Sequence, residues 1–175
     1  MQKFIGLIRG INVGGHKKLP MAELRSICED AGLNEVRSYI QSGNLVFSSN
    51  LDKETCARLI YEGINSRMGF TADCMVVEAD TFKKIADAYP YSTEDHKHAH
   101  LMFLNAEPEG RAIRELEKLD HAPDLFEVRK HVVYFYLPNG ISGSRIDYNK
   151  VAKILGVSGT ARNWRTVRKL FEMLD

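Results

Sequence analysis

Residues 36–48, VRSYIQSGNLVFS, decide the fold of this chain because they read as a β-hairpin set between two helices. Residues 36–41 and 45–48 are rich in Val, Ile, Tyr and Phe, and Ser-Gly-Asn between them supplies the turn. Apolar residues at helical spacing precede the hairpin over residues 20–31 and follow it over residues 54–68. The hairpin is therefore the middle of a helix-strand-strand-helix order.

The flanking segments complete this order. Residues 3–8 and 71–78 read as strands, and Pro20 is well placed at the first position of the first helix. The first half then has the order β-α-β-β-α-β. This order predicts a ferredoxin-like unit, or α/β-plait, in which a four-stranded antiparallel sheet is covered by two helices on one face.

The second half repeats the order more loosely. Its expected elements are a helix at 80–88, a strand at 100–105, a helix at 109–119, a hairpin of 125–129 with 132–137, and a helix at 148–155. The glycine-containing residues 157–161 match the closing strand poorly, and residues 163–174 read as a C-terminal helix. We predict an α+β fold of two ferredoxin-like subdomains with antiparallel sheets, 1–78 and 79–175, the second irregular with an extra C-terminal helix.

Composition and charge narrow the class of protein. Of the 175 residues 44% are hydrophobic and 27% charged, as in an ordinary globular domain, and no apolar run approaches the roughly 20 residues that span a bilayer. The apolar stretch before Arg9 is too short for a secretory signal, so we expect a cytoplasmic protein with no membrane partner.

The three cysteines are odd in number and share no Cys-x-x-Cys spacing, which indicates neither a disulfide framework nor a zinc clamp. Cys28, Cys56 and Cys74 each fall at an apolar position of an expected helix or strand. We expect all three to be reduced and mostly buried.

The net charge of +1 hides an uneven distribution. Residues 78–127 contain 12 acidic and 6 basic side chains, whereas residues 145–169 contain 7 basic and 1 acidic. The basic segment can serve a polyanion such as nucleic acid, or it can be attracted by the acidic segment. Residues 44–48 lack the basic-glycine-aromatic pattern of an RNA-recognition module, so nucleic acid is weakly supported.

The glycine-rich residues 9–18, RGINVGGHKK, invite comparison with a phosphate-binding loop. Four residues separate Gly10 from Gly15, as in a P-loop, but His16 stands at the lysine position and Lys17 at the Ser/Thr position. A looser nest of backbone N–H groups beside the basic side chains can still bind an anion. The alternative is a tight crossover whose glycines take positive φ and whose asparagine bonds backbone groups. The candidate ligand-binding residues of this loop are Arg9, Asn12, Gly14, Gly15 and Lys17.

The C-terminal helix begins with the wrong sign of charge. Arg162 and Arg165 lie at its expected opening turn, where the helix dipole disfavours a cation by roughly 0.3–1 kcal/mol. Such a cation needs a negative partner, either a buried carboxylate of this chain or a bound anion.

The same segment supplies other roles. Thr160 or Asn163 can cap the helix, and Trp164 lies on its apolar stripe and is expected in the core. We take Arg162 and Asn163 as further candidate ligand-binding residues. If one anion site uses both segments, the folded chain brings the loop of Arg9 next to Arg162.

Two other groups of polar residues give weaker indications of a functional site. The hairpin tip holds Gln41, Ser42 and Asn44. Turn formation explains them, and the nucleophile-elbow context is missing, so no catalytic residue is assigned. An alternating run of histidines has an aspartate beside it: His96, His98, His100 and Asp95. Because most of that segment reads as a loop, metal binding is a minority interpretation and no metal ligand is assigned.

Three separated segments resemble a known family. Residues 7–15 continuing through 20–24, residues 39–44 and residues 160–166 are similar, in that order, to a mainly bacterial family catalogued as domain of unknown function 1697. The resemblance implies two α/β-plait subdomains. It brings no activity, substrate, cofactor or catalytic residue.

We therefore expect a binding protein for a small phosphate- or carboxylate-bearing ligand, held by the glycine-rich loop and the Thr-Ala-Arg-Asn-Trp segment. One alternative is a phosphoryl- or nucleotide-processing enzyme at the same loops, which needs a general base or a metal carboxylate beside the cations. Another is a protein-interaction module that uses a sheet edge or face. No cofactor is expected.

Overall fold

The computed structural model describes residues 1–91, 94 and 97–175, and the chain divides into two compact units. The first unit is Met1–Asp87 together with Lys169–Asp175, and the second is Ala88–Arg168. The predicted division into domains after residue 78 stays a prediction. Within the described residues, no helix has the length and apolar character that a membrane crossing requires.

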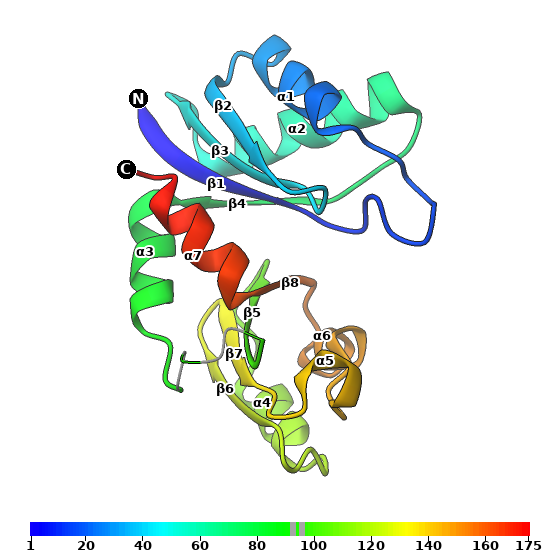
Figure 1. Cartoon of the computed structure of the whole chain (residues 1–175), viewed down its shortest axis with the longest axis vertical. Helices are drawn as coiled ribbons and strands as arrows, with labels where there is room; N and C mark the ends of the chain where they lie inside the picture. Colours follow the sequence, from blue (N-terminus) through cyan, green and yellow to red (C-terminus); the bar gives the residue numbers. More distant parts are fainter. Residues whose placement is uncertain (92–93, 95–96) are drawn as a thin grey trace. The chain divides into compact units, whose positions relative to one another are not determined.

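The first unit contains the expected split β-α-β order. Its strands are antiparallel in the order β2-β3-β1-β4 (Figure 1). The strands are β1 (Gln2–Ile8), β2 (Asn34–Tyr39), β3 (Asn44–Ser49) and β4 (Cys74–Glu78). Two helices connect them, α1 (Met21–Asp30) and α2 (Lys53–Met68). The hairpin of β2 and β3 is therefore where the sequence places it, and the ferredoxin-like fold of this unit is confirmed.

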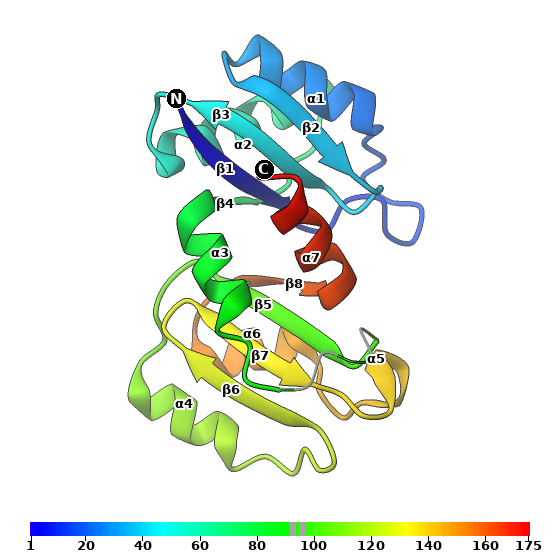
Figure 2. The ribbon, with the colours of Figure 1, turned by 60° about the vertical axis from the view of Figure 1, so that its left-hand side comes forward.

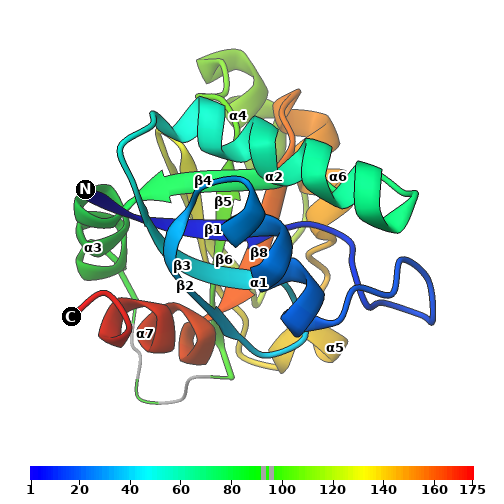
Figure 3. The same cartoon turned by 90° about the horizontal axis from the view of Figure 1, so that it is seen from above.

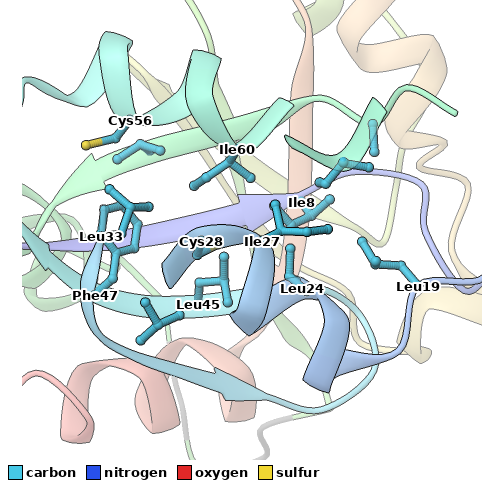
Figure 4. Close-up of a cluster of buried hydrophobic side chains, with 14 of the residues drawn as sticks. Ile8, Leu19, Leu24, Ile27, Cys28, Leu33, Leu45, Phe47, Cys56 and Ile60 are labelled. Carbon is cyan, nitrogen blue, oxygen red and sulfur yellow. The ribbon is translucent and has the colours of Figure 1, made fainter. Parts of the chain in front are cut away.

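The core of the first unit lies between α1, α2 and one face of the sheet, as Figures 3 and 4 show. Leu24 and Ile27 of α1 meet Ile60 of α2 there, and all three are buried. On the sheet below, Phe4 and Phe47 stack with ring centroids 5.5 Å apart. Full burial of a side chain of this size contributes about 1.5–3 kcal/mol, so this layer supplies much of the stability of the unit.

The opposite face of the first sheet is covered as well, which differs from the expectation of helices on one face. Helix α3 (Ala79–Asp87) contacts β1 and β4. Lys3 Nζ donates to the carbonyl of Leu174 at 2.7 Å, and Arg37 donates to the carbonyl of Met173. Lys3 alternates with Phe4 along β1, so the end of the chain lies on the face away from α1 and α2. The sequence pattern missed this cover because it joins segments far apart in the chain.

The second unit repeats the topology of the first. Its four antiparallel strands have the order β6-β7-β5-β8, the same order with each number raised by four (Figure 2). The strands are β5 (Ala99–Leu104), β6 (Leu125–Arg129), β7 (Val132–Tyr136) and β8 (Gly159–Asn163). The helices are α4 (Gly110–Glu117), the short α5 (Gly140–Gly143) and α6 (Tyr148–Leu155). The C-terminal α7 (Trp164–Glu172) begins in the second unit, and its residues from Lys169 on belong to the first. The predicted pair of ferredoxin-like subdomains is confirmed.

The closing strand β8 is better formed than its sequence indicates, and it lies two residues further along the chain than the expected 157–161. It pairs with β5 along its whole length, from Gly159 beside Leu104 to Asn163 beside His100. A Cβ atom at Gly159 would lie 2.6 Å from the Met102 side chain and 2.9 Å from a backbone oxygen. The glycine that weakened the prediction of a strand is thus the residue that lets β8 approach β5.

The thiols are only partly as expected. Cys28 and Cys56 are free and buried, and Cys74 is free but half-buried. Cys74 departs from the prediction because it opens β4, an edge strand of the first sheet.

Candidate functional site

The glycine-rich loop is a small β-hairpin. The backbone N–H of Asn12 donates to the carbonyl of Lys17 at 3.1 Å, and Gly14 and Gly15 form the turn between them with φ of 58° and 78°. Two successive residues with positive φ are the mark of a type I′ turn, which suits the twist of a two-residue hairpin. The loop is therefore a closed two-residue hairpin, whereas a phosphate loop leads directly into a helix.

The side chain of Asn12 fixes this hairpin. Its Nδ2 donates to the carbonyl of Leu19 at 2.9 Å and to the carbonyl of Gln41 at 2.7 Å, while its Oδ1 accepts from the backbone N–H of Leu19 at 2.8 Å. Both amide hydrogens are used inside the protein. Asn12 therefore has the backbone-bonding role of the tight-crossover alternative, and in a ligand site it would position the loop rather than donate to the ligand.

The β2–β3 turn lies against the base of the same loop. The backbone N–H of Ile8 donates to the carbonyl of Gly43 at 2.8 Å. A Cβ atom at Gly43, whose φ is 74°, would lie 2.7 Å from Cβ of Ile8 and 2.8 Å from Cδ1 of Ile11. In this turn Ile40 has φ of 49° and is half exposed, an uncommon conformation for a β-branched residue. Residues 7–15 and 39–44, two of the three segments that resemble the family, therefore pack against each other.

The hairpin projects its basic side chains into solvent. Residues 13–18 are all exposed, and Figure 3 shows the loop between β1 and α1 extending beyond the sheet. Lys17, with φ of 47°, donates from Nζ to the carbonyl of Thr71 at 2.7 Å. An ammonium group has three hydrogens, so Lys17 can hold this carbonyl and a ligand oxygen together. Arg9 is half-buried at the base of the loop, and Lys18 is exposed beside Lys17.

Arg162 lies on β8 and not in the opening turn of the C-terminal helix. Its side chain is only 9% exposed, and Nη1 donates to Oγ1 of Thr160 at 2.6 Å and to the carbonyl of Ala161 at 2.8 Å. These two bonds are not all of its contacts. The expected charge conflict at the helix start therefore concerns only Arg165, which is exposed.

Asn163 and Trp164 have the structural roles that the sequence predicts. Oδ1 of Asn163 accepts from the backbone N–H of Thr166 at 2.9 Å and so caps α7. Trp164 is buried, with its ring centroid 4.9 Å from that of Tyr89. The use of Asn163 and Arg162 in one site with Arg9 stays a prediction, because Arg9 belongs to the first unit and the other two to the second.

Buried polar groups of the second unit escaped the sequence reasoning. Among the described residues, three buried polar atoms lack a hydrogen-bond partner: Nδ1 of His100, Oδ1 of Asp124 and the hydroxyl of Tyr148. Burial lowers the pKa of His100 to about 4. Only His100 carried a signal, the alternation with His96 and His98; His96 and Asp95 lie outside the described residues. Within the described part of the chain no three His, Cys, Asp or Glu side chains are grouped to hold a metal.

Comparison with known proteins gives a family and a fold. The family model described as "Protein of unknown function (DUF1697)" matches residues 1–134. A solved structure, that of the conserved bacterial protein SP0830 from Streptococcus pneumoniae, is similar over 99% of both chains with 26% sequence identity and a TM-score of 0.73. No curated protein matches. The family match covers Met1–Asp87 of the first unit, both loops described above, and strands β5, β6 and the start of β7 in the second unit. The chain therefore belongs to the DUF1697 family of proteins of unknown function.

Proposed function

We propose that this chain is a binding protein for a phosphate- or carboxylate-bearing ligand, and that the glycine hairpin of the first unit is its contact surface. One observation carries the proposal. Asn12 and Lys17 hold positive φ in a loop that is locked by side-chain hydrogen bonds and surrounded by basic residues. Backbone strain of about 1–3 kcal/mol per residue persists where the surrounding structure enforces it, and such strain clusters at ligand-binding sites.

Each candidate residue then has a stated role. Lys17 and Arg9 supply positive charge, the backbone N–H groups of Gly14 and Gly15 supply further donors, and Asn12 holds the loop in place. Arg162 and Asn163 of the second unit remain further candidate anion-binding residues in this proposal. A cytoplasmic setting in a bacterium agrees with the free cysteines and with the bacterial source of the similar protein SP0830.

Titration of the purified protein with inorganic phosphate, pyrophosphate and citrate, followed by amide NMR shifts, tests the proposal. We expect saturable shifts at Gly14, Gly15 and Lys17, and weaker binding by about tenfold in Lys17→Met, the loss of one charge-assisted bond of about 1.5 kcal/mol. Lys53→Met is the matched control, because Lys53 is an exposed lysine at the start of α2. Shifts that do not saturate, or equal weakening in both variants, would refute anion binding at the hairpin.

A protein-interaction module is the second candidate, favoured by exposed apolar side chains on the same two loops. Val13 is 68% exposed in the glycine hairpin, and Ile40 is 50% exposed in the β2–β3 turn. Analytical ultracentrifugation of the wild type and of a Val13→Ser, Ile40→Ser double variant tests for self-association through this surface. A concentration-dependent dimer that the double variant abolishes would support this candidate, and a wild type that stays monomeric would rule out self-association through it.

A further inference from the structure

The second unit contains a cavity of about 120 Å³ that none of the sequence-predicted site residues lines. It lies where the end of α4, the start of β6 and the first turn of α6 meet. Half of its lining residues are apolar, among them Leu116, Phe126 and Val151. A cavity of roughly 150 Å³ with apolar walls accepts a benzene molecule, so this one suits a small apolar group of similar size.

One wall of the cavity is an oriented histidine. Nδ1 of His121 lies 2.8 Å from the backbone carbonyl of Asp124, and because a carbonyl only accepts, Nδ1 carries the hydrogen. In neutral His121 the other ring nitrogen, Nε2, is then a hydrogen-bond acceptor. The ring also meets Phe126 edge-on, with centroids 4.7 Å apart, which fixes its plane.

Asp124 contacts the segment that leads from Ser144 to Arg145 at the cavity. It is 1% exposed, and its Oδ2 accepts from Oγ of Ser144 and from the backbone N–H of Arg145, each at 2.9 Å. Its Oδ1 has no partner among the described residues. Asp124 therefore contacts two residues that line the cavity: its backbone carbonyl accepts from the ring of His121, and its carboxylate accepts from the backbone N–H of Arg145.

The charged side chains at the rim are two carboxylates and two cations, and their formal charges sum to zero. The two carboxylates at the rim are already engaged: Asp120 pairs with Arg145, and Asp147 accepts from the backbone N–H groups of Asn149 and Lys150. The ammonium of Lys150 has no ion pair within the described part of the chain, and it too lines the cavity. Lys150 is therefore the cation with which a ligand carboxylate can pair, and it lies beside an apolar floor.

We propose that this cavity binds a small organic acid, with an apolar body of about the size of a phenyl ring held among Leu116, Phe126 and Val151 and with its carboxylate at Lys150. The site lies in the second unit and does not depend on anion binding at the glycine hairpin. Benzoate is the probe that has both parts. Benzyl alcohol has the body without the charge, benzylamine reverses the charge, and acetate has the charge without the body.

Amide NMR titration of the full chain with these four compounds is the experiment. We expect saturable shifts at His121, Phe126 and Lys150 with benzoate, weaker ones with benzyl alcohol, and none with benzylamine or acetate. Lys150→Met keeps the apolar stem and loses the charge, so it should weaken benzoate binding about tenfold, since a hydrogen bond to a charged group contributes about 1.5–3 kcal/mol. Lys153→Met, on the same helix but outside the cavity lining, should leave binding unchanged.

A second variant tests the cavity itself. Leu119→Phe adds volume at the half-buried edge of the cavity and should abolish the benzoate shifts while the amide spectrum stays dispersed. Three results would overturn the proposal: no saturable benzoate shifts at these amides, equal binding of benzylamine and benzoate, or equal weakening by Lys150→Met and Lys153→Met. Because Lys150 is exposed, its replacement leaves the fold intact, and the lysine comparison decides the proposal if Leu119→Phe does not fold.

Discussion

The side-chain amide of Asn12 donates a 2.7 Å hydrogen bond to the backbone carbonyl of Gln41, 29 positions further along the chain. This bond ties the glycine hairpin to the β2–β3 turn. Those loops hold two of the three segments by which the chain resembles its family, so the shared residues there are explained first by the way the loops hold each other. Anion binding, as proposed above, would be a further use of a loop that these hydrogen bonds already hold in place.

We call the side-chain hydrogen bonds of Asn12 to Leu19 and Gln41 the Asn12 clamp. The variant Asn12→Asp tests this clamp. A carboxylate keeps the acceptor for the N–H of Leu19 but loses both donors, so at a net 0.5–1.5 kcal/mol per hydrogen bond the free energy of unfolding should fall by about 1–3 kcal/mol. Asn50→Asp, at an exposed position after β3, is the control. Urea unfolding measures both, and equal losses would show that the clamp does not stabilise the unit.

Alanine variants of Gly43 and Gly15 distinguish the effect of backbone strain from that of steric overlap. Their φ values are nearly equal, 74° and 78°, but a Cβ atom meets Ile8 and Ile11 at Gly43 and nothing within 4 Å at Gly15. Gly15→Ala should destabilise by about 1–2 kcal/mol from φ alone. Gly43→Ala should destabilise by about 1–3 kcal/mol more, because it overpacks the site. Similar thermal unfolding of the two variants would mean that the loop yields to the added methyl group.

His100 should make stability depend on pH. Burial lowers its pKa from 6.5 to about 4, so the unfolded chain takes up a proton at a higher pH than the folded chain does. Stability from this residue is complete above pH 6.5 and is lost as pH falls from 6.5 to 4, by on the order of 3 kcal/mol in all. Urea unfolding at a series of pH values measures this loss. The free energy of unfolding of His100→Gln should depend less on pH between 6.5 and 4, whereas that of His131→Gln, at an exposed position, should depend on pH as in the wild type. A profile that is unchanged in His100→Gln would contradict the assignment.

Arg162 is expected to be structural in the first place. Its replacement by Met leaves Oγ1 of Thr160 and the carbonyl of Ala161 without their donor, and each buried group left unsatisfied costs about 1–3 kcal/mol. Arg165→Met, at an exposed position one residue into α7, should change unfolding little. If Arg162→Met instead leaves the melting temperature unchanged and removes only phosphate-induced stabilisation, Arg162 is a ligand contact.

The cysteines should differ in their reaction with a thiol reagent. Burial raises the pKa of Cys28 to about 12 and also raises the pKa of Cys56, so little thiolate forms at either position near pH 8. Cys74 is half-buried on an edge strand. Mass spectrometry after brief labelling should find the adduct on Cys74 first. Labelling of Cys28 at the same rate would mean that the α1 side of the core opens readily.

The sequence predicts those elements of the fold whose cause is local. The β2–β3 hairpin has its turn residues in place, and Leu24 and Ile27 mark the buried face of α1 by their spacing alone. Strand β8 has no such pattern, because its stability comes from pairing with β5, more than 50 residues earlier. The chain end that reaches Lys3 was missed for the same reason.

The candidate site residues also differ in whether their role depends on local sequence or on distant neighbours in the fold. The backbone-bonding role of Asn12 could be anticipated as the alternative to ligand binding, because an asparagine among turn glycines bonds nearby backbone groups. Arg162 was placed at a helix end because its strand was not recognised, and the environment of a strand residue is set by its neighbours in the sheet. Asp124 and Tyr148 belong to no local pattern, so only the fold reveals their burial.

The return of residues 169–175 to the first unit has a consequence for synthesis. The chain leaves the ribosome from its N-terminus, so Lys3 and Arg37 are made long before their partners near Leu174. At about 5–20 residues per second, translation of the second unit alone adds roughly 4–16 s between the end of the first sheet and the return of the chain to it. During that interval one face of the nascent first sheet lacks part of its cover, which is the stage at which a chaperone would have most to protect.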